Sequence, residues 1–236
     1  MAWREIGPHR IYRGAWTDVI DEVRGEVDAL CSDPPYGMKA NTDSTRFSGG
    51  SGSGRNRGRK WGPIVGDDRS FDPGPFLGFR RVALFGMNHF AARLPVGTTL
   101  VWVKRNDAAF GKFLSDAELV WMKGGHGVYC RRVVSSPSKT IFEACGKWPG
   151  QGGRSAHPTQ KPLDIMDWVL RRLRVPAGGV VFDPFMGSGS TGVACVRLGL
   201  RFVGCEIVPE YFDAAAGRID REVAATADAR RLPTAA

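Results

Sequence analysis

The stretch "VVFDPFMGSGSTG", residues 180–192, decides the fold. Its apolar start predicts a buried strand that ends at Asp183, and Gly187, Gly189 and Gly192 then follow the pattern G-x-G-x-x-G at the start of a predicted helix. The next predicted strand, "RFVGCEI", carries Glu206 near its end. A strand, a glycine turn, a helix and an acid in this order predict a nucleotide-binding βαβ unit.

Three classes of ligand can be weighed for this glycine turn. A P-loop requires Lys before Ser or Thr, and "GSGSTG" contains no Lys, so nucleoside triphosphate chemistry is excluded. A nicotinamide dinucleotide remains open, because the glycine pattern alone is a weak signal. The third class is a nucleoside cofactor with a methionine moiety: Asp183 would hold its positively charged amino end, and Glu206 would bind the ribose hydroxyls.

Strand and helix patterns alternate around this unit. Strands are predicted at residues 9–14, 27–33, 80–86, 98–104, 117–125, 178–185 and 201–207, and helices at 17–25, 87–94, 161–175, 189–199 and 209–225. The buried face of the helix at 161–175 is predicted to consist of Leu163, Ile165, Met166, Val169, Leu170 and Leu173. The alternation predicts an α/β fold with a doubly wound, mostly parallel sheet and helices on both faces.

At 236 residues the chain is predicted to form one domain, residues 1–236, with two long loops. The first, about residues 39–62, combines a Gly/Ser tract with clustered Arg and Lys and is predicted to be a flexible basic loop. The second, about residues 124–156, is rich in Gly, Ser and Pro. Residues 226–236 are predicted to be a frayed tail.

The composition indicates the cellular compartment and the class of binding partner that we expect. Lys and Arg number 33 against 24 acids, and the net charge of +9 favours a polyanionic partner such as nucleic acid. The five cysteines are odd in number and three lie in apolar runs, which predicts core positions in a reduced, cytoplasmic setting. His126, Cys130 and Cys145 fit no standard zinc pattern, so no metal is expected. No apolar run approaches the ~20 residues of a membrane span, and the N-terminus lacks a signal-peptide core.

A second chemical signal is "CSDPPYGM", residues 31–38, which follows the predicted strand at 27–33. Pro34 and Pro35 fix φ and remove two backbone donors, so they can simply end the strand, with Asp33 opening a turn and Gly37 closing it. The motif is equally compatible with a site that presents Asp33 and a rigid carbonyl to a ligand. The other motifs have to decide between these interpretations.

The motifs "DPPYG" at 33–37, "HPTQKP" at 157–162 and "FDPFMGSGSTG" followed by "GCEI" resemble, in this order, the DNA amino-methyltransferases of the circularly permuted β type. The resemblance extends to "PIVGDD", "TTLVWVKRND" and "AELVWMKGG" and spans most of residues 10–220. It implies the Rossmann-like methyltransferase fold, S-adenosylmethionine as methyl donor, and an exocyclic amino nitrogen of a base in double-stranded DNA as acceptor.

Carried over residue by residue, the resemblance implies a cofactor site and a catalytic motif. The implied cofactor residues are Asp18, Asp33, Thr159, Gln160, Lys161, Asp183, Pro184, Phe185, Gly187, Ser188, Gly189, Thr191 and Glu206. Among these, Thr159, Gln160 and Lys161 would lie at the methionine end, and Asp18 near the adenine. Asp18 is also a candidate N-cap for the helix at 17–25. The catalytic motif is Asp33, Pro34, Pro35 and Tyr36.

The chemistry explains why this motif suits an amino acceptor. The lone pair of an aromatic amino nitrogen is delocalised into the ring, so two hydrogen-bond acceptors are needed to draw it back onto nitrogen. Asp33 supplies one acceptor and the Pro34 carbonyl another, while the prolines keep the backbone rigid. The target base must leave the duplex, and Tyr36 can stack on it. Phosphate contacts are predicted for Arg46, Arg55, Arg57, Arg59 and Lys60, unless this loop is a solvated linker.

Several alternatives remain open at this stage. Asp33 at the first motif position favours adenine N6 over cytosine N4, which is the alternative acceptor in the family. A nicotinamide-dependent oxidoreductase and a non-catalytic DNA-binding protein are more remote hypotheses. The chain offers no large target-recognition domain, so recognition is expected to be short, relaxed or shared within a homodimer, as would suit a restriction-modification or phage enzyme.

Overall fold

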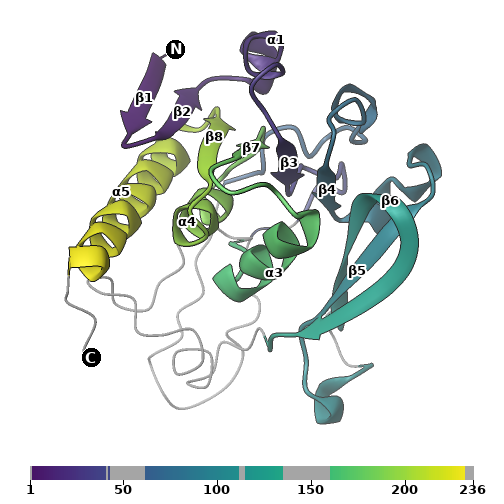
Figure 1. The fold of residues 1–236 in the computed structure, drawn as a ribbon. Helices are drawn as coiled ribbons and strands as arrows, with labels where there is room; N and C mark the ends of the chain where they lie inside the picture. The colour runs from purple at the N-terminus through teal and green to yellow at the C-terminus, as the bar shows by residue number, and fades with distance from the viewer. Residues whose placement is uncertain (1, 41, 43–61, 112–114, 135–159, 232–236) are drawn as a thin grey trace, which may run out of the picture.

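The computed structural model describes residues 2–40, 42, 62–111, 115–134 and 160–231, which build one eight-stranded sheet (Figure 1). The strand order is β1-β2-β8-β7-β3-β4-β6-β5. The strands are β1 (Ala2–Ile6), β2 (His9–Arg13), β3 (Ala29–Ser32), β4 (Val82–Phe85), β5 (Gly97–Val103), β6 (Ala117–Arg132), β7 (Val180–Asp183) and β8 (Arg201–Glu206). The strands from β2 to β4 in this order run parallel, and β1 pairs antiparallel with β2.

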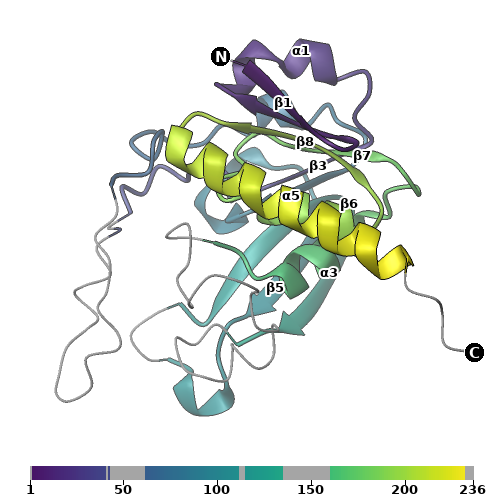
Figure 2. The same ribbon diagram turned by 90° about the vertical axis from the view of Figure 1, so that its left-hand side faces the viewer.

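Helices cover both faces of this sheet. On one face lie α3 (Leu163–Leu173), α4 (Ser190–Arg197) and α5 (Pro209–Arg231), and on the other lies α1 (Ile20–Val23) (Figures 1 and 2). Short 3-10 helices complete the described chain: η1 (Trp16–Asp18), η3 (Gly74–Phe76), η4 (Met87–His89), η5 (Ala91–Arg93) and η6 (Asp107–Ala109). The predicted doubly wound, mostly parallel Rossmann-like fold is therefore confirmed.

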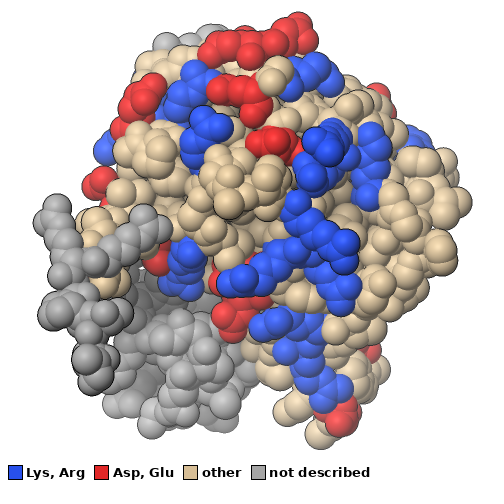
Figure 3. Space-filling view, in the orientation of Figure 1, with Lys and Arg blue, Asp and Glu red and all other residues tan. Residues whose placement is uncertain are grey.

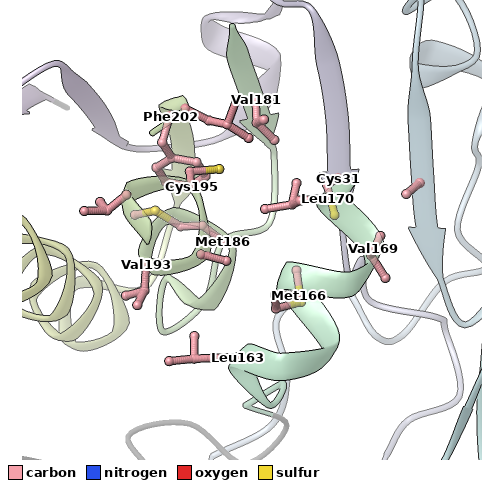
Figure 4. Close-up of a cluster of buried hydrophobic side chains, with 14 of the residues drawn as sticks. Cys31, Leu163, Met166, Val169, Leu170, Val181, Met186, Val193, Cys195 and Phe202 are labelled. Carbon is pink, nitrogen blue, oxygen red and sulfur yellow. The ribbon is translucent and has the colours of Figure 1, made fainter. Parts of the chain in front are cut away.

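The core consists of two apolar layers, because side chains alternate across each strand. In β3, Ala29 and Cys31 face the layer under α3 and α4, whereas Leu30 faces the layer under α1. All six apolar positions predicted for α3 are buried, and several of them meet Met186, Cys195 and Phe202 in the cluster of Figure 4. The cysteines at 31, 195 and 205 are buried, as three of the five were predicted to be.

Strand β6 extends further than the sequence predicted. Residues 117–123 run antiparallel to β5, and residues 128–132 run parallel to β5 along its other edge. Gly124 and Gly125, with φ of 83° and 67°, allow the bend between the two arms. The prediction that the loop begins at residue 124 is therefore wrong for residues 124–132, because the second arm finds backbone partners on a free strand edge.

Three other elements differ from the prediction. Helix α5 continues to Arg231, so residues 226–231, which were predicted as tail, are helical, because their Ala-rich sequence favours helix. The helix predicted at 87–94 is split into η4 and η5 at Phe90, whose φ is −141°. Strand β1 was not predicted, since it is an edge strand stabilised by pairing with β2 rather than by a buried apolar pattern.

Gly189 gives the first testable prediction. It precedes α4 with a φ of 77°, and a Cβ at this position would lie 2.9 Å from Ala215 Cβ on α5. Gly189→Ala combines left-handed strain with overpacking and is expected to lower the unfolding free energy by about 2–4 kcal/mol in urea titrations. The matched control is Gly25→Ala, whose Cβ meets no atom within 4 Å, and it should change stability by less than about 0.5 kcal/mol. Equal unfolding midpoints for the two variants would contradict this role.

Candidate functional site

The carboxyl ends of β3 and β7 lie side by side at the point where the strand order reverses. From β3 the chain goes on to β4 on one side, and from β7 it goes on to β8 on the other. Such a switch point leaves a crevice outside the strand ends, where ligands of this fold class bind. Asp33 directly follows β3, Asp183 ends β7, and Ser32 Oγ donates a hydrogen bond of 2.6 Å to Asp183 Oδ1.

A cavity of about 520 Å³ occupies this crevice. It brings together most of the predicted site residues: Asp33, Pro34, Pro35, Tyr36, Gln160, Lys161, Asp183, Pro184, Phe185, Gly187, Ser188, Thr191 and Glu206. Trp16, Ile64, Met166 and Ile207 add apolar walls that were not predicted. Its volume lies in the range of small-molecule sites, about 300–1,000 Å³.

Two predicted residues lie elsewhere in the described chain. Asp18 is exposed, accepts a hydrogen bond of 3.3 Å from Tyr12 Oη, and is not one of the described residues that line the cavity. It also makes no side-chain cap for η1 or α1. Gly189 packs against α5 instead of lining the cavity.

The remaining predicted site residues are Thr159, Arg46, Arg55, Arg57, Arg59 and Lys60, and they lie outside the described residues, as does Cys145 of the discarded zinc candidate. Within the part of the chain that is described, no cluster of His, Cys, Asp and Glu has a geometry suited to a metal ion. No helix of that part is long and apolar enough to cross a membrane.

Asp183 is a buried carboxylate held by three donors. Besides Ser32, Thr191 Oγ1 donates to Oδ2 at 2.5 Å and the Phe185 amide donates to Oδ1 at 3.1 Å. Burial raises the pKa of Asp183 to about 6, although these hydrogen bonds act in the opposite direction. The side chain therefore keeps a proton more readily than an ordinary Asp until a cationic group approaches.

Glu206 ends β8 on the other side of the glycine turn. Its Oε1 accepts the Val208 amide at 2.8 Å, and the amides of Gly187 and Ile207 also donate to it. Burial raises the pKa of Glu206, and the backbone donors oppose that rise. The carboxylate is thereby oriented at the cavity wall, where hydroxyl donors of a ribose would find an acceptor.

Tyr36 connects the Asp-Pro-Pro-Tyr turn to η4, which follows β4. Its Oη donates a hydrogen bond to Asp33 Oδ1, and its ring stacks on His89 at a centroid distance of 4.7 Å with an interplanar angle of 11°. Gly86, with φ of 72°, allows this arrangement because a Cβ there would overlap the Tyr36 ring. The strand end therefore fixes the aromatic ring and the carboxylate together.

A chain of alternating charges extends from Asp33 across the cavity. Lys161 Nζ lies 2.5 Å from Asp33 Oδ2 and 3.3 Å from Glu118 Oε2, and Lys104 Nζ donates to Glu118 Oε1 at 3.1 Å. Sequence reasoning missed Glu118 and Lys104. The available signal for Glu118 was an acid at the start of the otherwise apolar stretch "AELVWM".

Asp33, Lys161 and Glu118 lie close enough together that each shifts the pKa of the others. Burial raises the pKa of Asp33, and Lys161 only partly offsets that rise. Burial lowers the pKa of Lys161, but Asp33 and Glu118 outweigh it and hold that pKa well above its ordinary value. For Glu118, burial is outweighed by Lys161 and Lys104, so its pKa is lowered. Lys161 and Glu118 are therefore both ionised near neutral pH.

Asp67 is a second residue that the sequence interpretation did not single out. It is 4% exposed, and its carboxylate accepts the amides of Gly37 and Met38 at 2.7 and 3.2 Å and the amide of Ala40 at 2.7 Å. These bonds tie the chain that leaves Tyr36 to the chain that returns toward β4. The turn after the Asp-Pro-Pro-Tyr motif is thus held from outside the motif.

Comparison with known proteins identifies the family. Residues 101–217 match the model of the N6/N4 family described as "DNA methylase". The type II methyltransferase M2.DpnII of Streptococcus pneumoniae is 29% identical over 124 residues, which is 52% of this chain and 42% of that protein's length. The chain thus spans less than half of this relative. Over residues 101–217 the chain therefore matches the N6-adenine/N4-cytosine DNA methyltransferase family.

Solved structures support the fold. The M1.HpyAVI complex with SAM has a TM-score of 0.54 at 21% identity and covers 89% of this chain and 98% of its own. The cytosine-N4-specific PvuII DNA methyltransferase has a TM-score of 0.54 at 14% identity, with 92% and 90% covered. At these identities the likeness concerns the fold alone.

The contacts of Asp67 lead to the second prediction. Asp67→Ala leaves three amides of the turn without their acceptor and is expected to lower the unfolding free energy by about 1–3 kcal/mol. Amide hydrogen exchange at Gly37, Met38 and Ala40 should also accelerate. The control is the neighbouring Asp68→Ala. The Asp68 carboxylate is exposed, and its one ion pair among the described residues, with Arg69, is long at 3.8 Å. If exchange in the two variants were the same, Asp67 would not hold the turn.

Proposed function

We propose that this chain transfers a methyl group from S-adenosylmethionine to an exocyclic amino nitrogen of a base in DNA, with adenine N6 as the favoured acceptor. The observation that carries the proposal is the shared cavity. The cavity is lined by the buried carboxylates Asp183 and Glu206 beside the glycine turn, and it is also lined by Asp33, Pro34 and Tyr36 of the neighbouring strand end. A donor site and an acceptor site of complementary chemistry thus open into the same space.

The cofactor half has the groups that S-adenosylmethionine requires. Asp183 offers a buried carboxylate to an ammonium group, and Glu206 offers acceptor oxygens to two ribose hydroxyls. Phe185 and Trp16, with ring centroids 6.4 Å apart, give apolar surface for a nucleobase. When bound, this cofactor supplies a methyl group on a positively charged sulfur, which retains the electron pair of the broken carbon–sulfur bond.

The acceptor half prepares the amino nitrogen. Asp33 accepts one N–H hydrogen bond, and the buried Pro34 offers its backbone carbonyl, with no amide hydrogen of its own to compete. Both bonds return electron density to the nitrogen. Once the nitrogen carries a positive charge it becomes acidic, and Asp33 takes up the proton before releasing it to water. Asp33 therefore needs only the basicity of an ionised carboxylate.

DNA as substrate is supported by charge and by Tyr36. The chain carries a net charge of +9, and Lys and Arg side chains gather in a band over the region of α3 in Figure 3. Extruding a base costs a few kcal/mol, and stacking on Tyr36 returns about 1–3 kcal/mol of this. The Asp of the Asp-Pro-Pro-Tyr motif favours adenine, whereas the fold is shared with a cytosine-N4-specific enzyme and does not discriminate.

The deciding experiment uses unmodified genomic DNA. The purified protein is incubated with this DNA and labelled S-adenosylmethionine, and the nucleosides are then separated by mass spectrometry. N6-methyladenine is the expected product, and single-molecule sequencing would give its sequence context. N4-methylcytosine would overturn the acceptor assignment, and DNA affinity without any transfer would overturn the enzymatic function.

Substitutions in the acceptor half give the third prediction. Asp33→Ala is expected to reduce kcat by about 10²–10⁴-fold, because no carboxylate remains to accept the amino proton. Tyr36→Ala should weaken capture of the flipped base by about 1–3 kcal/mol, measured with 2-aminopurine at the target position. Tyr36→Phe keeps the ring but loses the hydrogen bond to Asp33, so it should retain base capture. Methyl transfer by Asp33→Ala at the wild-type rate would contradict the mechanism.

The fourth prediction concerns pH and cofactor affinity. Binding of an ammonium group favours ionised Asp183, whose pKa in the unliganded protein is about 6. Affinity for S-adenosylmethionine should therefore be constant well above pH 6 and fall about tenfold per pH unit well below it. Calorimetry in buffers of different ionisation enthalpy should detect the released proton. Asp183→Asn should bind more weakly and without this pH step; an identical step in that variant would assign the proton to another group.

A further inference from the structure

Glu118 lines the cavity but has no role in the proposed methyl transfer as described above. It lies near the start of β6, on a different element from every residue of the Asp-Pro-Pro-Tyr motif. Its carboxylate shares the Lys161 ammonium with Asp33, at 3.3 Å against 2.5 Å, and its other oxygen accepts from Lys104. The four side chains carry two positive and two negative charges, and all of them line the cavity.

Lys161 needs an anionic partner at all times. It is 8% exposed, and a buried ammonium without a partner is strongly destabilising. Because two carboxylates flank it, the ammonium can shift from one to the other without being left unpaired. Lys161 Nζ needs to move only a short way to pair with Glu118 instead of Asp33, since Asp33 Oδ2 and Glu118 Oε2 are both already within ion-pair range.

Asp33, by contrast, is occupied on both oxygens. Oδ1 accepts from Tyr36 Oη and Oδ2 accepts from Lys161 Nζ. A carboxylate has about four acceptor sites, so a further donor can enter, but a charged donor already in place weakens the acceptor. The target amino group thus competes with Lys161 for the same carboxylate.

We propose that Glu118 is a positioning residue for Asp33: it takes over the Lys161 ammonium when the target amino group donates to Asp33. The inference rests on the proposed methyl transfer and adds a residue to its acceptor site. Only hydrogen bonds are exchanged in this step, and Lys161 keeps its three protons. Glu118 thereby lets Asp33 change partners while the net charge of the site stays constant.

The test is Glu118→Gln, which keeps the shape of the side chain and removes its charge. At saturating DNA and cofactor, kcat per folded molecule should fall at least about tenfold, while the KM for DNA and the Kd for S-adenosylmethionine stay within about twofold. The acidic limb of the kcat profile should also move to lower pH, because the negative charge of Glu118 raises the pKa of Asp33. The titratable groups around Asp33 are Lys161, Glu118, Tyr36, Asp183 and the Cys31 thiol.

Two further variants separate positioning from stability. Lys104→Met removes the other partner of Glu118, so it should strengthen the hold of Glu118 on Lys161 and raise kcat above the wild-type value. Asp107→Asn is the matched control. It removes the charge of Asp107 from an exposed ion pair of 2.6 Å with Arg132, which lies on the same strand as Glu118, and it should change neither kcat nor the pH profile.

The outcomes distinguish the two proposals. A wild-type protein that transfers no methyl group would overturn the proposed function and this inference with it. A wild-type protein that does transfer the group, beside a Glu118→Gln variant with unchanged kcat and an unmoved acidic limb, would overturn the inference alone. A lower kcat together with the shifted limb supports it, since a purely structural role for Glu118 would alter the yield of folded protein and not the limb.

Discussion

The hydrogen bond from Ser32 to Asp183 joins two parts of the chain that are 151 positions apart in the sequence. It exists because β3 and β7 are parallel neighbours, so that two strand ends, and the two turns that follow them, meet at one edge of the sheet. All of the proposed chemistry depends on this adjacency. Without the Asp-Pro-Pro-Tyr turn, the glycine turn would hold a methyl donor with no acceptor beside it. Without the glycine turn, the acceptor site would have no methyl donor.

The second constraint on the site is electrostatic. Among the acids that line the cavity are Asp33, Asp183, Glu206 and Glu118, and burial opposes the ionisation of each of these four. The protein resolves this conflict in three ways. Backbone amides support Glu206, hydroxyl and amide donors support Asp183, and ammonium groups support Asp33 and Glu118. The differences in support leave these acids with different proton affinities within a single cavity.

The sequence predicted the features that depend on short local patterns of residues. The buried strands, the glycine turn and the apolar face of α3 each depend on a short periodic pattern, and the structure has them where they were expected. The ion pair of Lys161 with Asp33 spans 128 positions, and the role of Asp67 depends on where a returning chain passes. The second arm of β6 likewise requires a free edge of β5. No local pattern encodes such contacts, which arise only from tertiary pairing.

The three hydrogen bonds that Asp67 accepts also affect how much the chain between residues 40 and 67 can vary in length. Because the amides of Gly37, Met38 and Ala40 are fastened to one returning carboxylate, the two ends of the intervening segment are fixed independently of what lies between them. Doubling the length of a closed loop costs only about 0.6 kcal/mol in chain entropy. A longer connection between residues 40 and 67 would therefore cost little, and Asp67 would keep the same hold on the turn that carries Asp33 and Tyr36.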